Sequence, residues 1–255
     1  MKGVQIIDLS VPMEVSPSEP GPIEVTHVGH SETAESMEKY FGCSESDLPQ
    51  GLGWANDRIK LTAHSGTHVD APWHFFPTSK GKKAKTIDEM PLEWFYSDGV
   101  MLDMKHKPTG SVISVADLQE ALTKINYKLK SWDIVLIQTG TDKLWGKKEY
   151  FDAGCGMGRE STLWLIDNGV RVMGTDAWGW DAPFWSIKEN FQKTKDKSII
   201  WAGHRVGIEK EYCHVEKLAN LDKLPRPYGF KVACFPIKLT GGSAGWSRVV
   251  AIFEK

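Results

Sequence analysis

The chain has 255 residues, 41% of them hydrophobic and 25% charged, an ordinary composition for a globular protein and a length that one large α/β domain can fill. With 31 basic against 33 acidic residues, the formal net charge of −2 gives no field that would attract nucleic acid or an anionic membrane. The sequence has no run of about 18 apolar residues that would predict a transmembrane helix, and an acid as early as Asp8 argues against a signal peptide, so we expect a cytoplasmic protein.

Strand patterns and polar loops share the first part of the chain. Residues 4–9 predict a first strand. The Pro- and Ser-rich stretch 12–22 and the polar segment 31–53 predict long surface loops, and loops of this length usually cover a site or a subunit contact. Residues 57–63 alternate as a strand that leads into a histidine-rich motif, and residues 100–103 predict another short strand.

Helices and strands alternate in the middle of the chain. Ser114 and Asp117 have the spacing of a helix cap, and helical periodicity continues through residue 125. A second helix over residues 160–168 stops at Gly169. The other predicted strands lie at 133–138, 170–174, 198–201, 231–237 and 248–253. This order favours a single α/β domain with a mixed sheet over residues 1–255.

Cysteine and tryptophan are informative by their number and spacing. The four cysteines form no Cys-x-x-Cys pair, so we expect free thiols in a reducing compartment. The eleven tryptophans exceed what core packing requires, and some are candidates to line a pocket for a flat, apolar substrate, although a buried structural role fits any single one.

Three histidines and one acid, His64, His68, Asp70 and His74, fall within eleven residues. A helix would place the first two on one face but turn Asp70 elsewhere, and the glycine and proline between them suit a helix interior poorly. On an extended chain all four positions have the same parity, so their side chains share one face. We therefore predict a bent extended segment that curls its polar face around a ligand.

Imidazole and carboxylate are the groups that bind a borderline metal such as zinc. Two histidines and one acid leave an open position for water, which distinguishes a catalytic zinc site from a structural one. The alternative is that these histidines are separately hydrogen-bonded near a loop, but then three of the eight histidines would fall in one bend by chance. We therefore predict a metal site in this segment.

A second group of polar residues lies downstream, between Trp201 and Asp222. By pattern alone, charges with helical spacing are typical of a solvated helix face. The group contains His204, Glu211, His214 and Glu216.

The run His-Ser-Gly-Thr-His-Val-Asp-Ala-Pro-Trp-His over residues 64–74 resembles the His-x-Gly-Thr-His-x-Asp-x-Pro-x-His signature of the cyclase family of metal-dependent hydrolases. That family includes bacterial kynurenine formamidases (arylformamidases) and isatin hydrolases. The resemblance implies a swivelling β/β/α fold and a homo-oligomer, a dimer or a tetramer. Supporting similarities lie at Asp8-Leu9-Ser10, Thr139-Gly140, Gly174-Thr175-Asp176, Glu216 to Leu221 and Arg248 to Ala251.

Carried over position by position, the resemblance implies that His64, His68 and Asp70 are the primary metal ligands. It implies that His74 acts in proton transfer.

The resemblance also implies a second metal, bridged by Asp70 and held by His204 and Glu216, which have the family's separation of twelve residues. Lys217 replaces the usual asparagine after the acid, and His214 is an additional potential ligand. We expect Zn²⁺, with one or two ions per subunit, and Mn²⁺ is the alternative because isatin hydrolases of the family use a single manganese.

The implied activity is cleavage of an amide C–N bond, as in an aryl formamide such as N-formylkynurenine, by metal-activated water. The alternatives are isatin hydrolase-like opening of a cyclic amide or lactone, a cyclase or isomerase that uses the same site, and a binding protein without turnover. The aromatic-rich chain favours a small, planar aromatic substrate as its partner. The formamidases place a tryptophan of their N-terminal loop near the substrate, and because no tryptophan precedes Trp54 in this chain, Trp54 is the candidate, with a core or interface role as the alternative.

Overall fold

The computed structural model describes residues 3–21 and 23–254, and the chain divides into two compact units. The larger unit comprises Met1–Pro20 and Ala63–Lys255 and is built around one nine-stranded sheet, whereas the smaller unit comprises Gly21–Thr62. The predicted mixed α/β class is confirmed, and a single domain over residues 1–255 stays a prediction. No helix in the described part of the chain combines the length and the apolar character that a membrane crossing requires.

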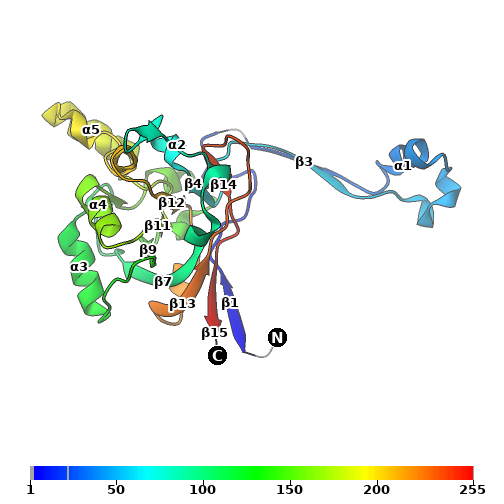
Figure 1. Cartoon of the computed structure of the whole chain (residues 1–255). Helices are drawn as coiled ribbons and strands as arrows, with labels where there is room; N and C mark the ends of the chain where they lie inside the picture. The colour runs from blue at the N-terminus through cyan, green and yellow to red at the C-terminus, as the bar shows by residue number, and fades with distance from the viewer. Residues whose placement is uncertain (1–2, 22, 255) are drawn as a thin grey trace. The chain divides into compact units, whose positions relative to one another are not determined.

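The main sheet is parallel in its centre and antiparallel towards both edges (Figure 1). Strands β7, β9, β11 and β12 run parallel to one another, while the flanking strands, including the N- and C-terminal strands β1 and β15, pair antiparallel. In sheet order the strands are β1 (Val4–Asp8), β15 (Val250–Glu254), β13 (Tyr228–Ala233), β7 (Tyr96–Asp103), β9 (Ile134–Gln138), β11 (Val172–Thr175), β12 (Cys213–Glu216), β4 (His68–Asp70) and β14 (Ala244–Trp246).

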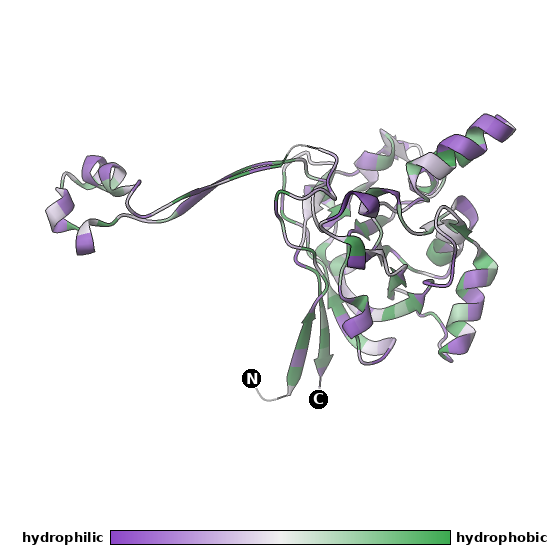
Figure 2. Cartoon of the chain, turned by 180° about the vertical axis from the view of Figure 1, so that it is seen from behind, coloured by the Kyte–Doolittle hydropathy of each residue, from purple (hydrophilic) through white to green (hydrophobic). Residues whose placement is uncertain are grey.

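The two faces of this sheet are covered differently. In β9, Val135 and Ile137 belong to the hydrophobic cluster that includes helices α3 (Val115–Lys124) and α4 (Arg159–Asp167). Ile134 and Leu136, which alternate with them, belong to a second cluster on the other face of the sheet. This alternation follows from the period-two geometry of a strand with both faces buried. Figure 2 shows the strands of the larger unit as largely hydrophobic ribbon.

Local signals in the sequence account for the ends of these helices. Ser114 accepts a hydrogen bond from the backbone N–H of Asp117, whose carboxylate accepts one from the backbone N–H of Ser114, a capping box that contributes about 1 kcal/mol. Gly169, with φ +91°, follows the end of α4. A further helix, α5 (Phe184–Thr194), lies where no helix is predicted. The remaining elements of this unit include α2 (Pro72–Phe75) and two small sheets, β5 (Thr78–Ser79) with β6 (Lys82–Lys83) and β8 (Val112–Ile113) with β10 (Gly156–Met157).

Two predictions about local structure are wrong. Residues 198–201 do not form a strand, because the Asp196 carboxylate accepts a hydrogen bond from the Ser198 backbone N–H and closes a 3-10 turn over Lys197–Ile199. The segment 31–53 is not a plain loop, because it contains helix α1 (Ala34–Phe41). The segment 12–21 is a loop as predicted, although Ser16 and Ser18 are buried.

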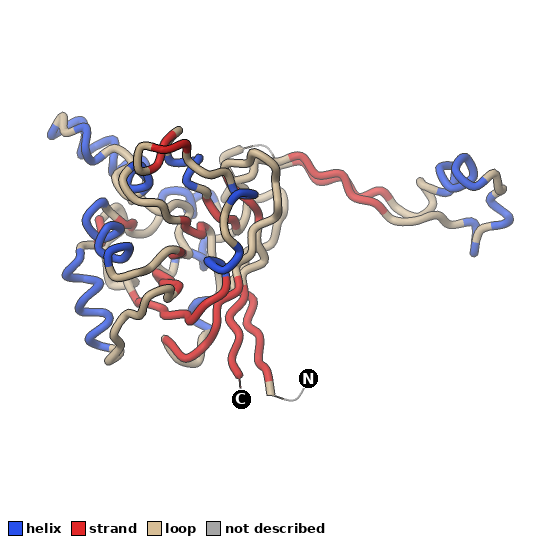
Figure 3. Tube along the Cα trace, viewed as in Figure 1, coloured by secondary structure: helices blue, strands red, loops and turns tan. Residues whose placement is uncertain are grey.

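The smaller unit is a two-stranded sheet that continues into helical turns (Figure 3). The strand predicted over 57–63 is present as β3, although it spans slightly different residues. Large apolar side chains of this unit, among them Tyr40, Phe41 and Ile59, are exposed. Its elements are β2 (Glu24–Val28), α1, 3-10 turns over Glu45–Asp47 and Pro49–Gly51, and β3 (Asn56–Lys60).

Candidate metal centre

Two neighbouring antiparallel strands supply the centre of the site. β4 pairs with β12 so that Asp70 lies opposite His214 and His68 lies opposite Glu216. Alternate residues of a strand share a face, so these four side chains project to the same side of the sheet, while the valines between them enter the hydrophobic core. The register of one strand pair therefore gathers two carboxylates and two imidazoles.

The turn before β4 and the helix after it add two more histidines. His64 lies in the turn, and His74 lies on the one-turn helix α2, which Pro72 begins at its first position. The prediction of one extended segment is therefore wrong outside β4. The helix returns His74 towards the strand, where its Nε2 lies 3.5 Å from Asp70 Oδ2.

A 3-10 helix, His204–Ile208, brings the downstream histidine to the same place. Gly207 allows this helix to pack closely on α2, because an added Cβ would lie 2.3 Å from the Cδ2 of Phe75. The rings of His74 and His204 are consequently 5.7 Å apart. His204 and Glu216 are buried, so the interpretation of this region as a solvated helix face is wrong.

Asp70 is fully buried, and imidazole nitrogens surround both of its oxygens. Oδ1 lies 2.9 Å from His64 Nδ1 and 3.2 Å from His68 Nε2. Oδ2 lies 3.1 Å from His214 Nε2 and 3.8 Å from His204 Nε2. Asp70 therefore lies between two groups of potential ligands.

Glu216 faces the same histidines from the next strand. Its Oε1 lies 3.2 Å from His214 Nε2 and 3.4 Å from His204 Nε2, and its Oε2 lies 3.6 Å from His68 Nε2. Atoms that bind one tetrahedral zinc at about 2.0–2.2 Å lie about 3.3–3.6 Å apart, which is close to these separations.

Several of these atoms are buried without a hydrogen-bond partner among the described residues: His68 Nε2, both carboxylate oxygens of Asp70 and both ring nitrogens of His214. Leaving such groups unpaired costs about 1–3 kcal/mol each, and more for a charged group. A divalent metal ion would satisfy the Asp70 oxygens and the Nε2 atoms of His68 and His214, which face the carboxylates, so the donor set fits a metal.

Two sets of ligand atoms lie mutually within 4.8 Å. His68, predicted as a primary ligand, belongs to neither set, although its Nε2 approaches Asp70 and Glu216. The sets are Asp70, His204, His214 and Glu216, and His64, Asp70 and His74.

The carboxylates are held in their charged form. Burial opposes ionisation of Asp70, but the charges of His74 and His68 and the close approach of the His214 and His64 ring nitrogens outweigh it and hold its pKa well below the usual range. Burial and Asp70 likewise act to raise the pKa of Glu216, but the close approach of the His204 and His214 imidazoles prevails and lowers it.

Two histidines of the site shift in opposite directions. Burial lowers the pKa of His74 to about 4, so the ring is neutral at pH 7. Burial alone would also lower the pKa of His204, but its hydrogen bonds with Asp181 and Glu216 raise that pKa to about 10. A metal at His204 Nε2 would therefore displace a proton as it binds.

Neighbouring groups fix the orientation of the ligands. Asp181 Oδ2 accepts a hydrogen bond from His204 Nδ1 at 2.5 Å, and Trp201 stacks on the His204 ring with the ring centres 4.1 Å apart. Sequence reasoning missed Asp181, which belongs to no motif. His68 Nδ1 bonds to the Gly66 carbonyl at 2.8 Å, a contact that directs its Nε2 towards the acids.

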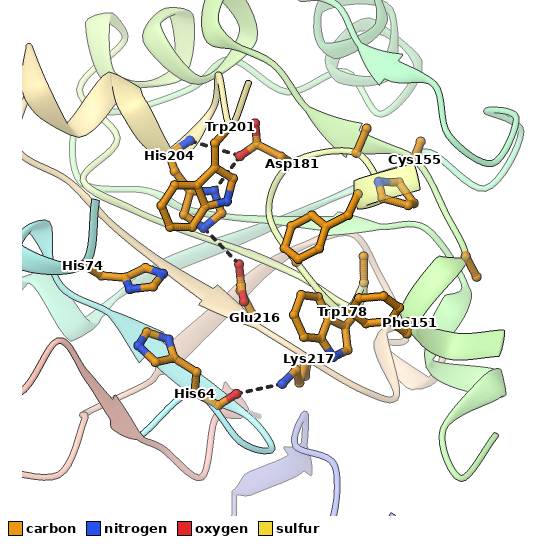
Figure 4. A pocket seen from close by; sticks show the side chains of 16 residues that line it. His64, His74, Phe151, Cys155, Trp178, Asp181, Trp201, His204, Glu216 and Lys217 are labelled. Carbon is orange, nitrogen blue, oxygen red and sulfur yellow. Dashed lines mark hydrogen bonds and ion pairs between the residues drawn. The ribbon is translucent and has the colours of Figure 1, made fainter. Parts of the chain in front are cut away.

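A pocket of about 170 Å³ opens on this centre (Figure 4). Figure 4 shows His64, His74 and His204 towards one side of the pocket and Phe151 and Trp178 towards the other. The aromatic wall comprises Phe151, Trp178, Phe184 and Trp201, and Cys155 also lines the pocket. Burial raises the pKa of the Cys155 thiol to about 12, so it is not a nucleophile at neutral pH.

Residues 7–182 match the model of a protein family described as "Putative cyclase". The protein named cyclase-like protein 1 of Arabidopsis thaliana is 24% identical over 225 residues, which cover 87% of this chain and 78% of that protein. The protein named kynurenine formamidase of Erythrobacter litoralis (strain HTCC2594) is 25% identical over 193 residues, which cover 76% of this chain and 74% of that protein.

Among solved structures, an isatin hydrolase bound to the product analogue thioisatinate superposes with a TM-score of 0.77 at 19% identity, covering 99% of this chain and 94% of that chain. Isatin hydrolase A from Ralstonia solanacearum gives a TM-score of 0.76 at 21% identity, covering 98% and 92%. At these identities the likeness shows that the fold is shared.

Proposed function

Because the chain belongs to the putative cyclase family, we propose that it is a metal-dependent hydrolase that cleaves an amide C–N bond in a small aromatic substrate. The observation that carries this proposal is the buried pair of carboxylates, Asp70 and Glu216, surrounded by imidazoles with unsatisfied nitrogens at the base of an aromatic pocket.

When bound here, a divalent metal would act as a Lewis acid and lower the pKa of water from about 15.7 towards about 7. We assign His64, His68 and Asp70 to the primary metal and His204 and Glu216 to a second one. The unsatisfied nitrogens of His214 add it to the ligand candidates of the second site. Zn²⁺ suits this mixture of imidazole and carboxylate, and Mn²⁺ is the alternative.

His74 is the proposed proton-transfer residue. Its ring is neutral at pH 7 and lies at the pocket, so it can accept a proton from the water that attacks the carbonyl carbon. A pKa of about 4 makes the ring a weaker base than ordinary imidazole and its protonated form a stronger acid, so return of that proton to the leaving nitrogen as the C–N bond breaks is the easier of the two transfers. A formamide would then yield formate and the free amine.

The aromatic wall supports an aryl substrate. Phe151 and Phe184 pack nearly perpendicular to the Trp178 ring, with interplanar angles of 76° and 79°, and all three rings line the pocket. An aryl formamide such as N-formylkynurenine is the first candidate, since a curated relative is named kynurenine formamidase. Opening of a cyclic amide is the second, since the likeness to isatin hydrolases covers nearly the whole chain.

The test combines elemental analysis with a substrate panel. Purified protein is assayed for metal content and for turnover of aryl formamides by formate release, of isatin by its absorbance, and of lactones. We expect one or two metal ions per subunit, loss of turnover on chelation and recovery with Zn²⁺ or Mn²⁺. Asp70→Asn should lose both metal and turnover, while the control Asp98→Asn, which alters an exposed ion pair, should lose neither.

Outcomes of the panel separate the remaining alternatives. Ring closure or isomerisation without net addition of water would replace the hydrolase by a cyclase or isomerase with the same site. Tight ligand binding without turnover under every metal tried would indicate a binding protein. A metal-to-subunit ratio near one would refute a stably filled second site.

We also propose that the chain forms a homo-oligomer in the cytoplasm. An isolated two-stranded sheet is marginally stable in water, and the smaller unit exposes Tyr40, Phe41 and Ile59. All four cysteines are free thiols, which suits a reducing compartment. Light scattering on the eluting protein tests for a dimer or a tetramer, and a monomer would contradict the proposal.

Trp54, which lies near Tyr40 in the smaller unit, stays a candidate for substrate contact.

A further inference from the structure

A buried ion pair lies beside the metal site, outside the set of proposed ligands. Lys217 Nζ lies 3.0 Å and 2.9 Å from the two carboxylate oxygens of Glu19, and 2.7 Å from the backbone oxygen of His64. The two side chains are 1% and 5% exposed. Removing both charges from water is costly, so an arrangement of this kind requires well-made hydrogen bonds to offset the loss of hydration.

The Lys217 ammonium has no donor left for a substrate. A lysine ammonium carries three N–H donors, and Glu19 and His64 provide three acceptors for them. The Trp178 ring lies against it, with Nζ 4.9 Å from the ring centre. Lys217 lines the pocket, and Figure 4 shows its ammonium directed at the backbone oxygen of His64.

Glu19 also contacts the histidine-rich motif of residues 64–74 directly. Its Oε1 also accepts a hydrogen bond from the backbone N–H of Gly66 at 2.7 Å. The pair therefore holds the turn of residues 64–66 at two backbone groups, one at His64 and one at Gly66. That turn sets the direction of His64, whose Nδ1 lies 2.9 Å from Asp70.

A second connection runs parallel to the first. Thr67 Oγ1 accepts from the Val11 backbone N–H at 2.9 Å and donates to the Lys217 backbone oxygen at 2.6 Å. Lys217 adopts φ +59°, in the left-handed region that lysine rarely occupies. This conformation lets one residue direct its carbonyl to Thr67 and its side chain to Glu19, immediately after the proposed ligand Glu216.

We propose that Lys217 and Glu19 are positioning residues that fix the turn carrying His64 and so set the metal affinity of the site. The proposal rests on the metal site of the proposed function. It assigns a role to the N-terminal loop, whose Glu19 would hold the ligand turn through Gly66 and Lys217.

The test measures cobalt binding to the metal-free protein. Co²⁺ is titrated into wild type, Lys217→Met, Glu19→Gln and the double variant, and both the dissociation constant and the visible absorption of the bound ion are recorded. Lys143→Met is the control, because Lys143 forms an exposed ion pair with Asp222 at 2.7 Å.

We expect Lys217→Met to raise the dissociation constant about 10- to 100-fold and to change the cobalt spectrum, as loss of groups that orient ligands does. The double variant should bind cobalt more tightly than Lys217→Met, because no unpaired carboxylate is left buried. If Lys217→Met does not fold, Glu19→Gln decides, since its amide oxygen can still accept from Gly66 while the charge and one of the two acceptors for Lys217 are lost, and it should shift affinity and spectrum in the same direction.

Unchanged affinity and an unchanged spectrum in a folded variant would overturn the positioning role. A rise in KM with metal binding unaltered would also overturn it and would indicate direct substrate contact instead. Failure of the wild type itself to bind Co²⁺, Zn²⁺ or Mn²⁺ would refute the proposed function and the inference together, an outcome distinct from the other two.

Discussion

His74 is the residue whose removal tests the proposed division of labour within the metal site. Its Nε2 lies 3.5 Å from Asp70, farther than the 2.9 Å of His64 Nδ1 and the 3.2 Å of His68 Nε2. This geometry suits a group that faces substrate and water more than one that closes a coordination shell.

Truncation of His74 to alanine should therefore remove proton transfer and leave the metal in place. General acid–base catalysis contributes about 10²–10⁴ in rate, which corresponds to about 2.7–5.4 kcal/mol of barrier at about 1.36 kcal/mol per factor of ten. We expect His74→Ala to lose kcat within this range while the metal content stays at the wild-type level.

The assay pairs kcat on an aryl formamide with elemental analysis of the same preparation. His106→Ala is the matched control, because His106 is exposed and lies outside the site. A kcat within about threefold of wild type at full metal content would refute the proton-transfer role. An empty site in His74→Ala would instead make His74 a ligand, as its position in one set with His64 and Asp70 allows.

Three further perturbations test the surroundings of the site. Asp181→Asn removes the charge that orients His204, so we expect metal affinity to fall about 10- to 100-fold in a calorimetric titration, and an unchanged affinity would contradict this role. Burial raises the pKa of Asp176 to about 6 from its ordinary value of 3.8. The folded state therefore holds a proton that the unfolded state has lost between these values, and the stability advantage of wild type over Asp176→Asn should fall by about 2.4 kcal/mol between pH 4 and pH 7. Urea unfolding at both pH values measures it, and a difference independent of pH would show that the carboxyl does not titrate there. Phe151→Ala removes part of the aromatic wall and should raise KM for aryl formamides about 3- to 10-fold, with metal content and KM for an aliphatic formamide unchanged; an equal effect on both substrates would argue against an aryl-binding wall.

Local order could be predicted well where one residue type decides it. The helix after Ser114 and the helix that stops at Gly169 lie where their capping residues indicate, because a cap acts on backbone groups only a few residues away. The buried strand Ile134–Gln138 can be predicted equally well, because a short apolar run bounded by turns is typical of a buried strand. The sequence of helix α5 contains no comparable capping signal, and helix α1 was not predicted because it lies in the polar segment 31–53.

The sequence by itself determined that His64, His68, Asp70 and His74 would meet, because a span of eleven residues leaves little freedom to separate them. Only the tertiary structure decided how they meet. A turn, a three-residue strand and a one-turn helix replace the single extended segment, and the pairing of β4 with β12 sets His214 and Glu216 against them.

The contributions of Asp181, Glu19 and Lys217 are likewise decisions of the tertiary structure. Glu19 and Lys217 are 198 residues apart in the chain, and no spacing rule connects residues at such a distance. Their meeting depends on the register of a nine-stranded sheet and on where loops cross its edge, which are settled when the whole core packs. Metal ligands that lie within one short motif can therefore be predicted from the sequence, whereas the distant residues that orient those ligands cannot.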